Sequence, residues 1–389
     1  MRITPLWNRH TWILAVIALC VAVVAPLRAM AQPSVETSAE EAILIDAETG
    51  AILMEKHADQ RMPPASMTKM MTIHLVFERL KDGRLSLQDT FPVSEKAWKK
   101  GGSSMFVEVG DQVKVEDLIR GIIVQSGNDA SIVVAEGLAG SESRFAELMN
   151  KKARELGMDK THFVNSTGWP HPEHQTTAHD LAKLALATIR RFPQYYHYYS
   201  QTTFKYNDIE QHNRNPLLYK EDFGSDGLKT GHTSKAGYGL TASAERDGRR
   251  LVLVVNGLDS KRARAQEAER LLDWGFREFG NYTLFKAGQT VTRADVWLGA
   301  RPRVPLVTKE RVFLTLPRAA RNEISAKAIY KGPIPAPVKK GQRLATLRIK
   351  APEMAARTFP LAAGRAVGRL GFFGRLGAAA RYIVFGASS

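Results

Sequence analysis

The chain of 389 residues carries a formal net charge of +16 at pH 7 and contains a single cysteine. This length allows a large domain with a sizeable core and a second, smaller domain. The basic balance favours an anionic partner, but the sequence contains no zinc finger and no ribonucleoprotein motif, which argues against nucleic acid.

Residues 1–31 have the pattern of a secretory signal. Two arginines precede an apolar run over 12–24, and Ala29-Met30-Ala31 matches the small-x-small site of a signal peptidase. We expect cleavage after Ala31; the alternative is an uncleaved N-terminal anchor. Cys20 lies inside this segment, so the mature chain has no disulfide. Cleavage removes three arginines, so the net charge falls only to +13. A basic, exported protein is expected to meet anionic lipid or cell-wall polymer as its partner.

The next stretch predicts a β-hairpin over 42–55 and then a helix over 70–80. The pair Pro63-Pro64 stops any helix from running in from upstream, which places Ser66 in the first turn and Lys69 on the same face. Free N–H groups at that end stabilise an anion, so Ser66 can be a nucleophile and Lys69 its base if burial or a second cation keeps the lysine neutral. Alternatively, Ser66 caps the helix and Lys69 is a solvated charge.

Two later motifs favour the catalytic interpretation. Ser126-Gly127-Asn128 lies on the turn between helices predicted over 115–124 and 128–138, where polar side chains can face a cleft. Lys229-Thr230-Gly231 begins a predicted strand, ahead of a β-hairpin over 238–258 with Asp-Gly at its turn. The order S-x-x-K, S-x-N and K-T-G, with wide spacings, is the motif set of penicillin-recognising serine hydrolases.

With Ser-Gly-Asn in the middle motif and His232 after the K-T-G, the chain resembles the low-molecular-mass penicillin-binding proteins that are serine-type D-Ala-D-Ala carboxypeptidases. The likeness runs from about residue 41 to 279. It implies an α/β (α+β) catalytic domain of the serine β-lactamase/DD-peptidase type, a small all-β domain and an amphipathic C-terminal tail. It further implies removal of the terminal D-alanine from peptidoglycan pentapeptide stems through an acyl-enzyme, covalent binding of β-lactams, and no metal or organic cofactor.

The resemblance also implies a role for each motif residue. Ser66 is the acylated nucleophile, Lys69 is its base, held by Ser126 and Asn128, and Ser126 relays a proton to the departing D-alanine. The substrate-binding set is Asn128 for the peptide, Lys229 and Thr230 for the terminal carboxylate, the N–H groups of Ser66 and His232 for the oxyanion, and Gly231 and Arg214 as further members.

Three other functions share these motifs. A β-lactamase needs a deacylating carboxylate, and no Glu-x-x-Leu-Asn-like stretch is present. A DD-endopeptidase of the same family stays open, although such members usually lack the β-rich domain and tail. A non-catalytic wall-binding protein is expected to have lost Ser66, Lys69 or Lys229, and all three are present.

A loop over 163–174 holds a possible metal-ligand cluster. His171 and His174, with Glu173 and the nearby His179, are residue types that bind zinc. Zincin signatures fix their histidines on a helix, and the two prolines in this loop forbid one. We therefore predict solvated loop histidines and no metal.

The chain divides into four segments. The catalytic domain is expected over 32–281 and ends after an amphipathic helix. Short alternating runs broken by proline and glycine over 282–351 predict the small β-rich domain. Segment 352–389 has too many arginines to span a bilayer and too many apolar residues for a linker, so we expect it to lie in an anionic membrane interface; the alternative is docking on the β-rich domain. Together with the signal, this predicts a periplasmic protein peripherally attached to the outer face of the inner membrane.

Overall fold

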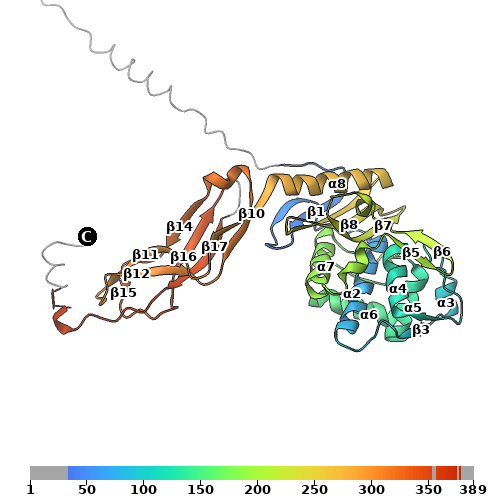
Figure 1. The fold of residues 1–389 in the computed structure, drawn as a ribbon, viewed down its shortest axis with the longest axis horizontal. Helices are drawn as coiled ribbons and strands as arrows, with labels where there is room; N and C mark the ends of the chain where they lie inside the picture. Colours follow the sequence, from blue (N-terminus) through green and yellow to red (C-terminus); the bar gives the residue numbers. More distant parts are fainter. Residues whose placement is uncertain (1–33, 353–355, 375, 378–389) are drawn as a thin grey trace, which may run out of the picture.

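The computed structural model describes residues 34–352, 356–374 and 376–377. The predicted signal segment and the last twelve residues lie outside the described part. Figure 1 shows an α/β domain that contains all three motifs and, beyond α8, an all-β domain. The predicted fold class is therefore confirmed for these two domains.

The catalytic domain is built on a five-stranded antiparallel sheet. Its strand order is β2-β1-β9-β8-β7. Both predicted hairpins form, and Asp247 and Gly248 at the β8–β9 turn have φ of 51° and 73°, the positive values that a tight hairpin turn requires. The strands are β1 (Glu41–Asp46), β2 (Ile52–Lys56), β7 (Ser225–Thr233), β8 (Gly237–Arg246) and β9 (Arg249–Leu258).

Helices cover both faces of this sheet. Leu44 and Leu253 pack with α8 (Lys261–Glu278) on one face, while Ile43 and Val254 join the larger core formed with the other helices. Burial on both faces explains why the central strands are almost continuously apolar. The helices of the second layer are α2 (Lys69–Lys81), α3 (Glu95–Trp98), α4 (Val115–Arg120), α5 (Asn128–Ala139), α6 (Glu142–Glu155) and α7 (Ala178–Arg191).

Polar caps define where three of these helices begin. The side chains of Ser141, Thr177 and Ser260 accept hydrogen bonds from the backbone N–H three residues later, at the starts of α6, α7 and α8. Such caps satisfy N–H groups that have no partner within the helix. The helix that carries the nucleophile starts differently, because a 3-10 turn, η1 (Ala65–Thr68), leads directly into α2.

The second domain is all-β, as predicted, but it extends further than expected. It contains a six-stranded sheet of order β14-β16-β17-β12-β11-β15 and the pair β10-β13. Its strands are β10 (Phe279–Phe285), β11 (Thr290–Trp297), β12 (Arg303–Thr308), β13 (Val312–Pro317), β14 (Ser325–Ile329), β15 (Ile334–Pro335), β16 (Arg343–Lys350) and β17 (Arg357–Ala363).

Strand β17 shows that the predicted boundary at residue 351 is too early. It pairs with β16 on one side and β12 on the other, and Leu361 and Ala363 are buried in the domain core. Because this strand begins with Arg357, the sequence suggested that it belonged to the arginine-containing tail. Arg369 is also tied to the domain by a β-bridge to Gly299. Within the described ranges, no helix has the length and apolar content to cross a membrane.

Candidate active site

The turn that carries Ser66 projects its hydroxyl toward Lys69. Pro64 precedes the turn, and the N–H of Met67 closes it on the Pro64 carbonyl at 3.1 Å. Ser66 is half-buried, and its Oγ accepts a hydrogen bond of 3.1 Å from Lys69 Nζ. The sequence-based expectation that the two side chains share one face is therefore met, although the turn is 3-10 rather than α-helical.

Lys69 is completely buried, and no carboxylate contacts its amine in the described part of the chain. Its Nζ donates to Asn128 Oδ1 at 2.8 Å and to the Thr167 carbonyl at 2.6 Å. Burial, followed by the positive charge of Arg214, lowers the pKa of Lys69 to about 7, while Asp129 opposes the shift. A substantial fraction of Lys69 is then neutral near pH 7 and can accept a proton.

Ser126 and Asn128 lie at the start of α5, after a π-helical turn, η2 (Gly121–Gln125). Ser126 has a left-handed backbone, with φ 61°, and its buried Oγ has no hydrogen-bond partner among the described residues. The predicted bond between Ser126 and Lys69 is therefore absent. Asn128 Oδ1 accepts from Lys69 and one N–H donates to the Gly101 carbonyl at 2.9 Å, which leaves one amide N–H for a ligand.

Strand β7 carries Lys229, Thr230, Gly231 and His232 past the nucleophile turn. A Cβ on Gly231 would lie 2.9 Å from the Pro64 carbonyl oxygen and 3.2 Å from Met67 Cγ, so only glycine allows this approach. Lys229 and Thr230 are buried, and the ring of His232 is exposed and stacks on Tyr238 at 3.9 Å. The structure thus brings the first and third motifs together.

The site is cationic. Burial, followed by the charges of Lys69, Arg214 and Arg264, lowers the pKa of Lys229 well below its usual value. The Lys229 amine reaches only the Thr230 carbonyl, at 3.4 Å, and has no ion pair among the described residues. Such a group is stabilised by an incoming anion, so this end of the site suits a carboxylate.

Arg214 and Arg264 complete the cationic set. Arg214 is exposed and donates to Ser103 Oγ at 2.5 Å, while the buried Arg264 of α8 donates to the Arg214 carbonyl at 3.2 Å. Arg214 was expected from its Asn-Arg-Asn context. Arg264 was missed, because its helix shows only an ordinary amphipathic pattern and nothing marks one of its arginines as buried.

The histidine loop, residues 163–174, differs from its prediction. His171 is exposed as expected, but His174 is buried and hydrogen-bonded to Thr68. The description of these histidines as solvated is therefore wrong for His174. Groups of histidine, cysteine, aspartate or glutamate arranged to hold a metal ion are absent from the described residues.

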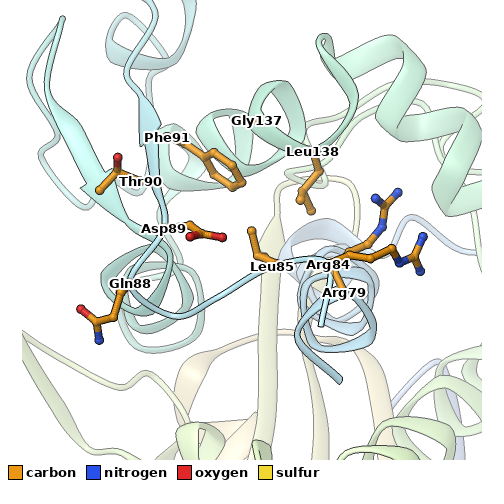
Figure 2. A pocket seen from close by; sticks show the side chains of 9 residues that line it. All are labelled: Arg79, Arg84, Leu85, Gln88, Asp89, Thr90, Phe91, Gly137 and Leu138. Carbon is orange, nitrogen blue, oxygen red and sulfur yellow. The ribbon is translucent and has the colours of Figure 1, made fainter. Parts of the chain in front are cut away.

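A groove of about 560 Å³, shown in Figure 2, lies away from this site. Arg79, in its wall, is ten residues beyond Lys69 on α2, about 15 Å along the helix. The lining contains no serine, cysteine or histidine, and we assign it no chemistry. Its residues are Arg79, Arg84, Leu85, Gln88, Asp89, Thr90, Phe91, Gly137 and Leu138.

Comparison with known proteins gives matches over both domains. Residues 27–260 match the family described as D-alanyl-D-alanine carboxypeptidase, and residues 279–369 match the penicillin-binding protein 5 C-terminal domain. The chain is 39% identical over 362 residues to the D-alanyl-D-alanine carboxypeptidase DacC of Escherichia coli, covering 90% of each.

Two solved structures are similar over most of the chain. The carboxypeptidase DacD from Francisella tularensis matches with a TM-score of 0.79 and 31% identity, over 88% of this chain and 96% of that one. Penicillin binding protein 5 from Haemophilus influenzae matches with a TM-score of 0.76 and 35% identity, over 86% and 99% respectively.

Proposed function

The chain belongs to the D-alanyl-D-alanine carboxypeptidase family, and we propose that Ser66 is its acylated nucleophile and Lys69 the base. The protein is a serine-type D-Ala-D-Ala carboxypeptidase that removes the terminal D-alanine from peptidoglycan pentapeptide stems and binds penicillin covalently. The observation that supports the residue assignment best is the 3.1 Å contact between Lys69 Nζ and Ser66 Oγ, made by a buried lysine that no carboxylate of the described residues contacts.

Acylation requires a neutral Lys69. Its amine takes the hydroxyl proton of Ser66 while Oγ attacks the carbonyl carbon of the penultimate D-alanine. The N–H groups of Ser66 and His232 donate to the oxygen that becomes negative in the tetrahedral intermediate. The free N–H of Asn128 holds the peptide of the acyl part.

Residues of β7 bind the leaving D-alanine. Lys229 and Thr230 bind its carboxylate, and the surrounding arginines add positive charge. Collapse of the intermediate breaks the C–N bond, and the amine takes a proton that Ser126 relays from protonated Lys69. Ser126 Oγ has no hydrogen-bond partner among the described residues, so this relay requires it to contact Lys69 when substrate is bound. Water then attacks the acyl-enzyme ester and releases the shortened stem.

The preferred substrate is tested with two muropeptides. The enzyme should release free D-alanine from a pentapeptide stem and cleave a cross-linked dimer much more slowly, because the dimer offers no small leaving group for the Lys229 end of the site. A pentapeptide with an amidated C-terminus is the matched control and should react slowly for want of a carboxylate. Chromatography of the products gives both rates. Faster cleavage of the dimer would assign an endopeptidase instead.

We also propose export through residues 1–31 and attachment of the C-terminal end to the anionic outer face of the inner membrane. Three apolar side chains at the end of the described chain support this placement: Phe372, Phe373 and Leu376 are 68%, 85% and 63% exposed. Large apolar groups gain free energy by entering a membrane interface, and neighbouring arginines meet anionic head groups. Tethering raises the enzyme concentration near the wall.

Truncation after Gly371 should abolish co-sedimentation with vesicles that contain anionic lipid while carboxypeptidase activity remains. This cut retains β17 and the hydrogen bond from the Leu370 N–H to the Leu298 carbonyl, so the second domain stays complete. Ile329→Ser, which removes an exposed apolar side chain from β14 instead, is the control and should sediment like the full chain. Equal binding by the truncated and full chains would contradict membrane attachment through this segment.

A further inference from the structure

His174 is a buried histidine that the proposed mechanism does not use. It is 2% exposed, and its ring packs edge-on against Phe163 at 5.6 Å. Both ring nitrogens have partners: Nδ1 lies 3.0 Å from the Val164 backbone nitrogen, and Nε2 lies 2.8 Å from Thr68 Oγ1. The buried ring is therefore fully hydrogen-bonded, and one of its two partners lies in the turn that carries Ser66.

These two contacts fix the direction of each hydrogen bond. The Val164 N–H can only donate, so Nδ1 accepts and the ring proton is on Nε2, which donates to the Thr68 hydroxyl. Burial, followed by the charges of His162 and His171, lowers the pKa of His174 to about 4. The ring is therefore neutral near pH 7, as this arrangement requires.

Thr68 lies between Ser66 and Lys69, and the histidine loop holds this turn at further points. The Thr167 carbonyl accepts from Lys69 Nζ at 2.6 Å, and the Ser166 carbonyl accepts from Thr72 Oγ1 at 2.8 Å. Gly168 is pressed against the turn, since a Cβ there would lie 1.8 Å from the Ala65 carbonyl oxygen. The loop and the nucleophile turn are thus one connected unit.

We propose that His174 is a positioning residue for acylation, which fixes the Ser66–Lys69 turn against the histidine loop through the hydroxyl of Thr68. This inference rests on the acylation chemistry proposed above. Without the Nε2–Thr68 bond, the turn is no longer held in place relative to the Thr167 carbonyl. Lys69 Nζ, which that carbonyl binds, then no longer keeps its distance to Ser66 Oγ. Small displacements of reacting groups slow a reaction strongly even when binding is unchanged.

Two isosteres separate the two contacts of His174. Asparagine places an amide near Nδ1, so His174→Asn retains an acceptor for Val164 and loses the bond to Thr68. Glutamine places its amide near Nε2, so His174→Gln retains a donor to Thr68. His171→Asn makes the same change at an exposed histidine of the same loop and serves as the matched control.

Stopped-flow acylation with a chromogenic penicillin gives the noncovalent dissociation constant and the acylation rate separately. We expect His174→Asn to lower the acylation rate about tenfold or more with little change in the dissociation constant, and His174→Gln and His171→Asn to retain most of the rate. Thr68→Val should match His174→Asn, the double variant should be no slower than either, and Thr68→Ser should retain most of the rate.

A wild-type rate in His174→Asn or Thr68→Val, or additive losses in the double variant, would overturn the proposal while leaving the proposed function intact. If His174→Asn does not fold, the Thr68 pair decides alone, because both of its variants keep His174. Absence of a penicillin adduct on the wild-type enzyme would instead reject the acylation chemistry itself.

Discussion

Lys69→Arg should lower the rate of penicillin acylation by about 10²- to 10⁴-fold, the range that general-base catalysis contributes. Arginine stays protonated at every accessible pH and cannot take the proton of Ser66. Arginine keeps a hydrogen-bond donor at this position but is fixed in the protonated form, so the variant lacks the neutral amine that acts as the base. The rate is read from the growth of the adduct with time.

The pH dependence gives an independent measure of the same base. Because the pKa of Lys69 is lowered to about 7, the neutral fraction grows as pH rises, and the wild-type acylation rate should rise through about pH 7 and level off above it. Lys69→Arg should lack this rise.

Lys152→Arg is the matched control for Lys69→Arg. Lys152 is also buried, but it pairs with Glu78 and Glu155, which help to raise its pKa. Its conversion to arginine should leave acylation and the rise with pH unchanged. Acylation by Lys69→Arg at near the wild-type rate would exclude Lys69 as the base.

The sequence predicted those parts of the site that depend on local geometry. The spacing of Ser66 and Lys69 places both on one face of any helical turn, and Lys229-Thr230-Gly231 directly precedes a hairpin that forms as expected. The glycine of that motif is explained only by the structure, because the Pro64 carbonyl that it approaches is distant in the chain.

The parts that were missed depend on long-range contacts. Thr167 contributes a backbone carbonyl, which any residue provides, so no side-chain pattern could mark it. His174 resembled its exposed neighbours in a proline-rich loop, and its burial follows from packing of that loop under the nucleophile turn. The expected contact between Lys69 and Ser126 is also absent, and the left-handed backbone of Ser126, directly after the π-helical turn, could not be read from the motif.

The end of the second domain shows a different limit. The strand β17 has a mixed pattern of exposed and buried residues, and its register is set by pairing with β12 and β16. A short apolar run near arginines has no periodicity that separates a strand from an amphipathic tail. Only strand pairing placed it in the domain.

The central claim is that Ser66 is acylated. A β-lactam places its amide carbonyl where the substrate carbonyl would react, so ring opening should leave a stable ester on Oγ. Intact-mass measurement after incubation with penicillin, followed by peptide mapping, should show one added ring-opened penicillin, on the peptide that contains Ser66. Ser66→Ala should show no adduct. The exposed Ser234, just past β7, provides the matched Ser234→Ala control, which should be labelled like the wild type. An adduct of the same mass on Ser66→Ala would contradict the assignment.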